Sequence, residues 1–414
     1  MSHHSFVVIG GGTAGIMVAS QLLKQRPNAD VAIIEPSDTH WYQPAWTLVG
    51  ANAYDMDKTR RPMASVMPKK ATWVQDKATG FSPGQNTVHT ASSGDLTYDY
   101  LVVAPGIHID TSMVEGLTEA IDRGVVCSNY TNPEHTWEVI RNFKGGTALF
   151  TQPTTPIKCG GAPQKIMYLA EEAFQKSGVR QDTKVVFATN GGVIFGVKPI
   201  AKTLMEVVDR KDINLRFKHS LVAVDGEKRI AWYDVPADAP QHNHLDVQTT
   251  REGDRVGIHF DMLHLAPPQR SPDFVRDSEL VNEAGWVDVH TGTLQHNRFA
   301  NIFSLGDVAG LPTAKTGAAI RKQVPIVVEN LLRLSDAQPV GDARYNGYSS
   351  CPLVTGYGKM VLAEFDYDSN FTPDPKLKRM LVFDSSKEDR RLWWLKKYIL
   401  PHLYWNKMMR GEAV

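Results

Sequence analysis

Two short apolar runs near the start of the chain flank a glycine-rich turn and an amphipathic stretch. The runs are Phe6–Ile9 and Val31–Ile34, each continuous and of a length typical of buried strands. Between them, GGGTAGIMVASQLLKQ places apolar residues at helical spacing after the glycines. The pattern predicts a strand, a glycine-rich turn, a helix and a second strand.

Apolar strands alternating with helical patterns continue through the chain. A strand in YDYLVVAPGI (98–107) ends at Ala104-Pro105-Gly106, and a strand in FANIFSLGDVAG (299–310) is followed by a predicted helix in LPTAKTGAAIRKQ. The stretch TKVVFATNGGVIFGVKPIAKTLMEVVDRKDINLRFKHSLVAV contains a second strand–turn–helix unit. This alternation predicts an α/β fold with two Rossmann-like dinucleotide-binding domains (the FAD/NAD(P)-binding fold).

The first glycine-rich turn carries a dinucleotide fingerprint. Gly10, Gly12 and Gly15 fit G-x-G-x-x-G, in which the first two glycines let the turn close and a pyrophosphate approach the helix N-terminus. Glu35, at the end of the second strand, is an acid placed to accept hydrogen bonds from ribose hydroxyls. Strand, helix and terminal acid together predict a dinucleotide site.

The later strands indicate that this dinucleotide is FAD. The turn after residue 103 is where flavoenzymes with two dinucleotide domains leave the FAD domain, and Gly306-Asp307 supplies a carboxylate for ribityl hydroxyls. The following helix N-terminus, with Lys315, offers a positive end to the flavin pyrimidine, which stabilises anionic reduced flavin.

The second unit lacks the pattern of a working NAD(H) site. We take its turn to be Gly191 to Gly196, which has the wrong spacing and carries bulky Ile194 and Phe195. The strand that follows ends in Lys218-His219, with no carboxylate for an adenosine ribose. We therefore expect a degenerate domain and an electron donor smaller than NADH.

Composition excludes several classes of function. Lys+Arg and Asp+Glu are equal at 45 each, which gives no basis for nucleic-acid binding. Three cysteines in 414 residues are too few for a disulfide framework, and the histidines lack ligand spacing, so no metal site is predicted. No apolar run approaches the ~20 residues that span a bilayer. The first strand begins too early to leave room for a signal or transit peptide.

Two of the cysteines lie in segments suited to chemistry. Cys159 precedes a predicted helix through Phe174, beside Lys158 and Lys165, so its thiol should have a lowered pKa and act as a nucleophile. Cys351, in SSCPLVTGYG, is expected in a polar turn of small residues. Cys127, in GVVCSNYTNPEH, follows two valines and is expected to be a buried strand cysteine.

The C-terminal stretch EDRRLWWLKKYILPHLYWNKMMRGEAV combines aromatic, aliphatic and basic residues. Aromatic side chains beside Lys and Arg suit a segment that lies in the headgroup region of a membrane. The alternative is a terminal helix packed on the core. We expect a membrane-associated segment that attaches to the bilayer without spanning it.

The chain resembles sulfide:quinone oxidoreductases, in particular the mitochondrial-type branch that also occurs in bacteria. The resemblance runs through EPSDTHWYQPAWTLVGA, TPIKCGGAPQKIMYLAEEAF, GWVDVHTGTLQH, NIFSLGDVAGLPTAKT and SSCPLVTGYGKMVLAEFDY. It implies a monotopic membrane flavoprotein that oxidises sulfide, holds sulfane sulfur between paired cysteines and reduces quinone (ubiquinone or menaquinone). A small acceptor such as sulfite or a thiol then takes the sulfur.

The resemblance also implies roles for particular residues. The redox cysteines fall on Cys159 and Cys351, and some branches employ a third cysteine, which leaves a role open for Cys127. Apart from the resemblance, we expect Lys165 to steady the Cys159 thiolate. The implied FAD contacts beyond the fingerprint glycines are Thr13, Ala14, Glu35, Gln43, Ala78 through its backbone, Asp307, Lys315 and Gly317.

We expect the FAD domain to be split over 1–110 and 290–340, with the degenerate domain at 111–289. A quinone-side and membrane-docking region follows at 341–414. The expected location is peripheral, on lipid at the cytoplasmic face of a bacterial inner membrane. The alternatives are a type II NADH:quinone oxidoreductase, a sulfide dehydrogenase that passes electrons to a cytochrome, and a flavin-binding adaptor without turnover.

Overall fold

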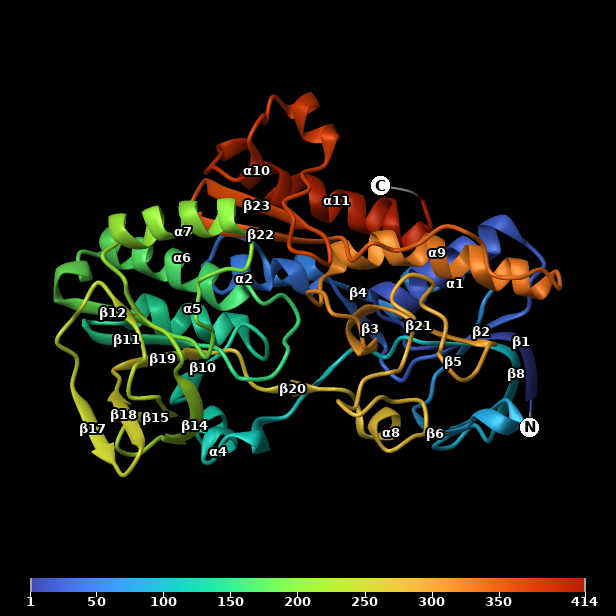
Figure 1. The fold of residues 1–414 in the computed structure, drawn as a ribbon, viewed down its shortest axis with the longest axis horizontal. Coiled ribbons are helices and arrows are strands. Elements are labelled where there is room, and N and C mark those ends of the chain that lie inside the picture. The colour runs from blue at the N-terminus through green and yellow to red at the C-terminus, as the bar shows by residue number, and fades with distance from the viewer. Residues whose placement is uncertain (1, 413–414) are drawn as a thin grey trace.

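The computed structural model describes residues 2–412 and contains two β-sheet domains side by side, with the C-terminal region lying across both (Figure 1). The first domain is built on a seven-stranded sheet of order β5-β2-β1-β8-β7-β6, with β21 also paired to β8. Its strands are β1 (Ser2–Ile9), β2 (Val31–Ile34), β5 (Thr72–Val74), β6 (Ala78–Ser82), β7 (Thr87–Thr90), β8 (Leu96–Val103) and β21 (Ile302–Ser304).

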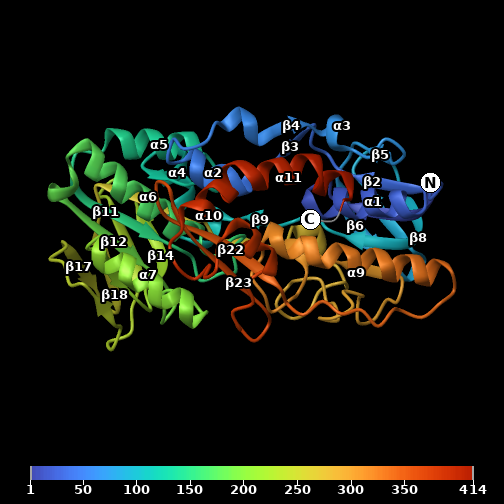
Figure 2. The same ribbon diagram turned by 90° about the horizontal axis from the view of Figure 1, so that it is seen from above.

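Parallel pairing puts the carboxyl ends of β1, β2, β8 and β21 at one edge of this sheet. Phe6 pairs with Val31 and with Tyr100, and Ile302 pairs with Leu101. Helices α1 (Thr13–Gln25) and α9 (Gly317–Ser335) cover one face and share its apolar core (Figure 2). Shorter elements follow β2: β3 (Thr39–Trp41), α2 (Trp46–Val49), β4 (Arg60–Pro62) and α3 (Met63–Val66).

The second domain has a six-stranded sheet of order β10-β19-β11-β12-β13-β16. Its strands are β10 (Val126–Cys127), β11 (Gly146–Thr151), β12 (Thr183–Ala188), β13 (Asn214–Arg216), β16 (Gln241–His242) and β19 (Met262–Leu265). Helices α5 (Pro133–Asn142), α6 (Ala162–Ser177) and α7 (Lys198–Arg210) cover one face. The other face packs on α4 (Leu117–Asp122) and on a smaller sheet of β14 (Ser220–Asp225), β15 (Ile230–Asp234), β17 (Thr249–Glu252) and β18 (Arg255–His259).

The strand order corrects our placement of the second nucleotide turn. β11 is the central strand from which the chain passes through α6 to β12, so the position of a dinucleotide fingerprint is the loop Gln152 to Gly161, not Gly191 to Gly196. This loop, QPTTPIKCGG, has no G-x-G-x-x-G and carries Cys159 instead. The candidate nucleophile therefore occupies the place where a working second domain would bind NAD(H).

Two antiparallel segments join the domains: β9 (His108–Ile109) and β20 (Gln269–Arg270). Immediately after β20, α8 (Asp273–Arg276) begins a stretch whose buried Val275, Leu280 and Val287 pack in the core of the first domain. We keep 1–110 and 341–414 as proposed bounds, and place the return to the first domain near β20, about 20 residues before the expected boundary between 111–289 and 290–340.

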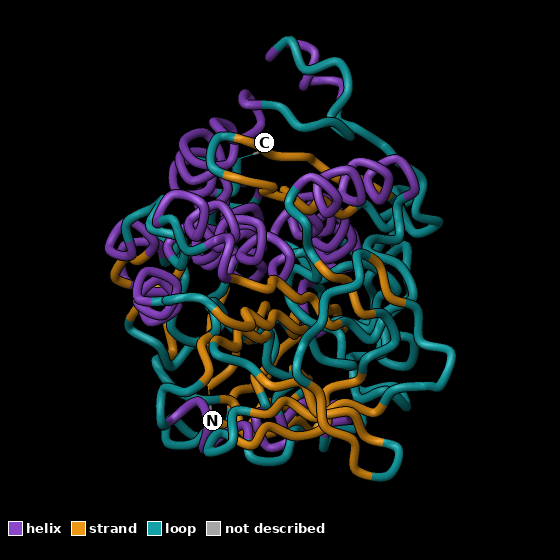
Figure 3. The backbone as a smooth tube through the Cα atoms, turned by 90° about the vertical axis from the view of Figure 1, so that its left-hand side faces the viewer, coloured by secondary structure: helices purple, strands orange, loops and turns teal. Residues whose placement is uncertain are grey.

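The C-terminal region packs on both domains. The hairpin β22 (Ser349–Gly356) and β23 (Lys359–Phe365) lies against α6, and an excursion that includes the 3₁₀ turn Pro375–Met380 projects from the molecule (Figure 3). The chain ends in α10 (Arg390–Trp394), a π-helical turn Leu395–Ile399, α11 (Leu400–Asn406) and a 3₁₀ turn Met408–Arg410. No helix within residues 2–412 has the length and apolar character needed to cross a bilayer.

Candidate active site

The glycine-rich turn between β1 and α1 is tightly built on one side and open on the other. Gly10 has a φ of 99°, and a Cβ on Gly15 would lie 1.9 Å from the Gly10 carbonyl oxygen, so neither position tolerates a side chain. No atom lies within 4 Å of the Cβ position of Gly12. Thr13 and Ala14 open α1 directly beside this free space.

Glu35 connects the end of β2 to this turn. Its carboxylate accepts hydrogen bonds from the backbone N–H of Gly11 and of Ser37, each at 2.7 Å. Its own N–H donates to the carbonyl oxygen of Val74 at the end of β5, four residues before Ala78. The predicted ribose acid therefore contacts the fingerprint turn directly, whereas Ala78 begins β6, at the other end of the strand order.

A second group of predicted residues lies where β21 leads into α9. The Gly306 N–H donates to Gln323 at 2.9 Å, and Lys315 Nζ donates to the carbonyl oxygens of Asp307 and Ala309. Burial raises the pKa of the Asp307 carboxyl and lowers the pKa of Lys315 to about 8. No donor within residues 2–412 makes a hydrogen bond to the Asp307 carboxylate.

The cysteine loop of the second domain is fastened to this part of the first domain. The Cys159 N–H donates to the carbonyl oxygen of Lys315 at 2.7 Å. Next to it, Lys158 Nζ donates to Gln43 Oε1 at 2.6 Å, and burial lowers the pKa of this lysine. Two residues predicted as flavin contacts thus hold the cysteine loop: Lys315 bonds to the backbone of Cys159, and Gln43 bonds to the side chain of Lys158.

The sulfur atoms of Cys159 and Cys351 lie 3.9 Å apart, and both thiols are free. Lys165 Nζ donates to Cys159 Sγ at 2.9 Å from the first turn of α6, and its side chain is buried. A Cβ on Gly161 would lie 2.6 Å from Cys351 Sγ, so glycine at this position lets the two sulfurs approach. Cys159 itself has a φ of 57°, a strained conformation of the kind that clusters at active sites.

The environment divides the two thiols into a thiolate and a thiol. A hydrogen bond from the Cys351 S–H and the charge of the Lys165 ammonium hold the pKa of Cys159 well below its usual value. The adjacent thiolate and burial raise the pKa of Cys351 well above its usual value. Cys159 therefore forms the thiolate more readily than Cys351 and would be the better leaving group of the pair.

One expectation about Cys351 is wrong. It does not lie in a polar turn but within strand β22, opposite Ala363 of β23, and only 3% of its surface is exposed. Ser349 and Ser350, which precede it, are also buried. The Ser349 hydroxyl is hydrogen-bonded to that of Thr316 at the start of α9. Their small size reflects close packing of the hairpin on α6 and α9, not a turn.

The chain is similar to known proteins over nearly its whole length. Residues 4–143 match the family model of pyridine nucleotide-disulphide oxidoreductases. The chain is 40% identical to the mitochondrial sulfide:quinone oxidoreductase of Mus musculus, over 99% of this chain and 87% of that protein. It is 39% identical to the Dictyostelium discoideum enzyme of the same name, over 98% and 86%.

The chain belongs to the sulfide:quinone oxidoreductase family. The crystal structure of the Aquifex aeolicus member superimposes with a TM-score of 0.76 at 19% identity, covering 100% of this chain and 92% of that chain, and thus shares the fold. The predicted fold class, with its two Rossmann-like domains, is confirmed. So is the assignment as an FAD-dependent oxidoreductase.

The residues present fit FAD. Three glycines along its expected course, Gly12, Gly160 and Gly317, have no atom within 4 Å of their Cβ positions, which leaves room for a ligand against the backbone. The half-buried Asp307 carboxylate has acceptor capacity for hydroxyl groups. The individual FAD contacts remain predictions for this member of the family.

Lys396, which no sequence pattern singled out, lies near the cysteine pair of this sulfide:quinone oxidoreductase family member. Its side chain is 5% exposed, and its Nζ donates to the Pro44 carbonyl oxygen at 3.1 Å. Burial and the Lys165 ammonium lower the pKa of Lys396 to about 7. Its sequence context gave no signal, because a lysine between Leu395 and Lys397 matches the pattern of a membrane-surface helix.

Tyr130 is a second missed neighbour. It is buried, and its hydroxyl donates to the Cys159 carbonyl oxygen at 3.2 Å. Cys127, by contrast, is the buried strand cysteine expected from the sequence. It lies in β10, its S–H donates to the Leu263 carbonyl oxygen, and burial raises its pKa to about 12.

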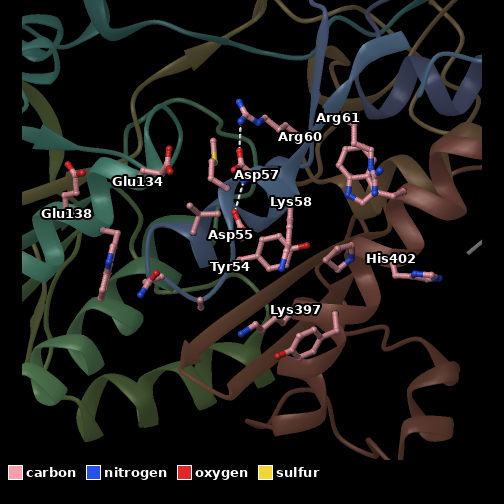
Figure 4. Close-up of a pocket in the computed structure, with 18 of the residues that line it drawn as sticks. Tyr54, Asp55, Asp57, Lys58, Arg60, Arg61, Glu134, Glu138, Lys397 and His402 are labelled. Carbon is pink, nitrogen blue, oxygen red and sulfur yellow. Dashed lines mark hydrogen bonds and ion pairs between the residues drawn. The ribbon is translucent and has the colours of Figure 1, made fainter. Parts of the chain in front are cut away.

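A groove of about 1110 Å³ opens on the outer side of the C-terminal helix, between the segment after α2 and helix α5 (Figure 4). Lys397 lines it, whereas Lys396 points inward to the cysteine side. The groove carries basic and acidic side chains in nearly equal number: Lys58, Arg60, Arg61, Arg141 and Lys397 against Asp55, Asp57, Glu134 and Glu138.

Proposed function

We propose that this protein oxidises sulfide at Cys159 and Cys351, reduces a membrane quinone, and passes sulfane sulfur to a small acceptor. The observation that carries the proposal is the pairing of the two sulfurs at 3.9 Å with the Lys165 ammonium at 2.9 Å from one of them. Bound FAD supplies the two-electron relay between the cysteines and the quinone.

The unequal thiols define the direction of sulfide attack. When the pair is oxidised to a disulfide, HS⁻ attacks Cys351 Sγ, the S–S bond breaks, and Cys159 leaves as the thiolate. Lys165 favours this outcome because it stabilises the charge on Cys159, and a thiol of lower pKa leaves faster. The sulfur of sulfide then remains on Cys351 as a persulfide, and the pair has gained the two electrons that sulfide lost.

Lys165 and Lys396 suit an anionic sulfur acceptor, such as sulfite or a thiolate. Both amines are buried on the cysteine side of the molecule, where water screens the attraction between a charged amine and an anion little; Lys165 carries this charge, and Lys396 adds to it below about pH 7. Transfer of the outer persulfide sulfur to such an acceptor leaves Cys351 as a thiolate or thiol. Reoxidation of the pair through FAD by quinone, Q + 2e⁻ + 2H⁺ giving QH₂, completes the balance.

The geometry of the second domain favours sulfide over NADH as the donor. The loop at the fingerprint position holds Cys159, and the Ile194 carbonyl oxygen accepts from Gln164 at the start of α6. Ile194 itself is buried against this helix. β12 ends at Ala188 before Thr189 and Asn190, so no carboxylate follows it for a ribose.

We place the membrane-docking surface on the excursion after β23 and on the outer side of α10. Large apolar side chains are exposed there, namely Leu381, Phe383, Trp394, Tyr398 and Ile399, with Lys376, Lys378, Arg379, Arg390 and Lys397 nearby in sequence. Figure 1 shows the backbone of this excursion at the top of the molecule. Such a surface inserts aromatic groups at headgroup level and attracts anionic lipid. The proposed location is the cytoplasmic face of a bacterial inner membrane.

Anaerobic mixing tests the donor and the acceptor in one experiment. Sulfide should bleach the flavin absorbance of the FAD-loaded protein, NADH should leave it unchanged, and a short-chain quinone should restore the oxidised spectrum after sulfide. Bleaching by NADH with no response to sulfide would instead establish the type II NADH:quinone oxidoreductase.

A further inference from the structure

A buried chain of hydrogen bonds joins the C-terminal helix α11 to the dinucleotide turn. Tyr404 OH lies 2.8 Å from Thr13 Oγ1 and 2.6 Å from His40 Nε2, and His40 Nδ1 lies 2.9 Å from the Gly11 carbonyl oxygen. Tyr404 and His40 are each 3% exposed. Residues separated by 391 and 364 positions in the sequence thus form one closed ring with the turn.

The chemistry of the groups sets the direction of every bond in this ring. A carbonyl oxygen only accepts, so His40 Nδ1 carries the proton and donates to Gly11. Burial lowers the pKa of His40, so its imidazole is neutral and its Nε2 accepts from the Tyr404 hydroxyl. The Tyr404 oxygen is then left to accept from Thr13, whose hydroxyl proton points toward α11.

Packing keeps Tyr404 in this position. Its ring centroid lies 4.5 Å from that of Tyr42 and 5.0 Å from that of Trp405. A separate hydrogen bond joins α1 to the 3₁₀ turn that follows α11: Ser20 Oγ donates to the Met409 carbonyl oxygen at 3.0 Å. The C-terminal helix is therefore part of the core around α1, and Figure 2 shows it beside that helix.

We propose that Tyr404 and His40 are positioning residues for FAD: they hold Gly11 and Thr13 in the shape that presents the turn to the pyrophosphate. The hydrogen-bonded ring contacts the turn on both sides of Gly12, at Gly11 and at Thr13. The open face of Gly12 is where the pyrophosphate would approach. A turn that is already ordered binds its cofactor more tightly, because binding need not supply the ordering free energy. FAD retention then depends on a residue of the C-terminal helix.

The test compares FAD binding by the full-length apoprotein in four variants. Tyr404→Phe removes the hydroxyl but keeps the aromatic side chain. It therefore opens the hydrogen-bonded ring and leaves His40 Nε2 and the Thr13 hydroxyl without this partner. We expect the dissociation constant for FAD, measured by fluorescence titration, to rise roughly tenfold. His40→Asn breaks the ring from its other end, and the double variant should be no worse than the poorer single variant, since both act through one chain.

Ser20→Ala is the matched control. It removes one buried hydrogen bond between α1 and the C-terminal segment without touching the turn, so FAD affinity should stay within about twofold of wild type. Excess FAD should restore sulfide-dependent flavin reduction in Tyr404→Phe, and its apoprotein should unfold at the temperature of the Ser20→Ala apoprotein.

Two results overturn the proposal. One is wild-type FAD affinity in Tyr404→Phe. The other is equal loss of affinity in Ser20→Ala and Tyr404→Phe, which would mean that the C-terminal segment acts by covering α1 and not through the ring. If Tyr404→Phe fails to fold, His40→Asn carries the same comparison, and wild-type affinity there is equally decisive.

Discussion

Cys159 Sγ and Cys351 Sγ lie 3.9 Å apart although 192 residues separate them, and the Cys159 N–H is bonded to the carbonyl oxygen of Lys315. The distance is a contact between free thiols, since a disulfide would bring the sulfurs to about 2.05 Å. Small movements of the two side chains suffice to close the bond. The hydrogen bond to Lys315 holds Cys159 next to the start of α9, where the flavin is predicted to bind.

Replacing either cysteine should abolish sulfide-dependent flavin bleaching. Cys159→Ser removes the thiolate and Cys351→Ser removes the sulfur that receives the sulfane atom, while FAD content should stay at the wild-type level in both. Cys127→Ser is the control, because Cys127 lies in β10 and its S–H donates to the carbonyl oxygen of Leu263, not to the cysteine pair. Full bleaching in either site variant would rule out the proposed mechanism.

Lys165→Met should raise the pKa of the Cys159 thiol. The variant removes the cation 2.9 Å from the sulfur, and an opposite charge at this range lowers a thiol pKa by about one unit or more. The pH midpoint of Cys159 alkylation by iodoacetamide, followed by mass spectrometry of the reduced protein, should therefore move upward. Lys158→Met, one residue from Cys159 and bonded to Gln43 instead, should shift it less.

Lys396→Met should stabilise the protein in a pH-dependent way. The lysine has a pKa of about 7 when folded and 10.5 as the reference value, so between these pH values only the unfolded chain binds the proton. The free energy of unfolding of the wild type therefore rises with pH across that window. Below it both states bind the proton, so the cost of burying the charged lysine does not change with pH. The gain from Lys396→Met should be largest below about pH 7 and vanish near pH 10.5.

Thermal or urea unfolding across pH measures this difference. Lys397→Met, its neighbour in the groove, is the control and should show no comparable pH-dependent gain. If the difference in free energy of unfolding between wild type and Lys396→Met stayed constant from about pH 6 to about pH 10, Lys396 would not be a buried lysine that loses its proton on folding.

The double variant Phe383→Asp/Trp394→Asp should lose most of its binding to liposomes of anionic lipid. These side chains are 78% and 50% exposed, and burying each in the interface contributes about 1.5–3 kcal/mol, so binding should weaken at least tenfold. Flotation with vesicles measures the bound fraction. Sulfide should still bleach the flavin, because neither residue touches the cysteines.

Met113→Asp is the matched control for the membrane experiment, since Met113 is also 50% exposed and lies shortly before α4 in the sequence. Figure 1 shows α4 at the bottom of the molecule, away from the C-terminal region at the top. Point variants are preferable to a truncation from Leu392 onward. Such a truncation also removes Lys396 near the cysteines and Tyr404 at the dinucleotide turn. Equal flotation of the double variant and the wild type would place the anchor elsewhere.

Local sequence patterns were enough for the dinucleotide turn and the class of fold. Gly10, Gly12 and Gly15 stand between an apolar strand and a helix, and their conformations depend on neighbours within a few residues. The low pKa of Cys159 was also foreseeable, because Lys165 is six residues further along on the first turn of α6. Where the pattern was ambiguous, as at Gly191 to Gly196, only the strand order identified the correct turn.

The sequence by itself thus determined an FAD-type Rossmann domain, a nucleophilic cysteine at a helix start and, through resemblance, its partner Cys351. The tertiary structure alone decided that Cys351 lies in a strand, that Lys396 is buried near the pair, and that Tyr404 closes a ring with the turn. The physical reason is that these contacts join segments hundreds of residues apart. Their burial and charge arise only when the C-terminal region packs across both domains.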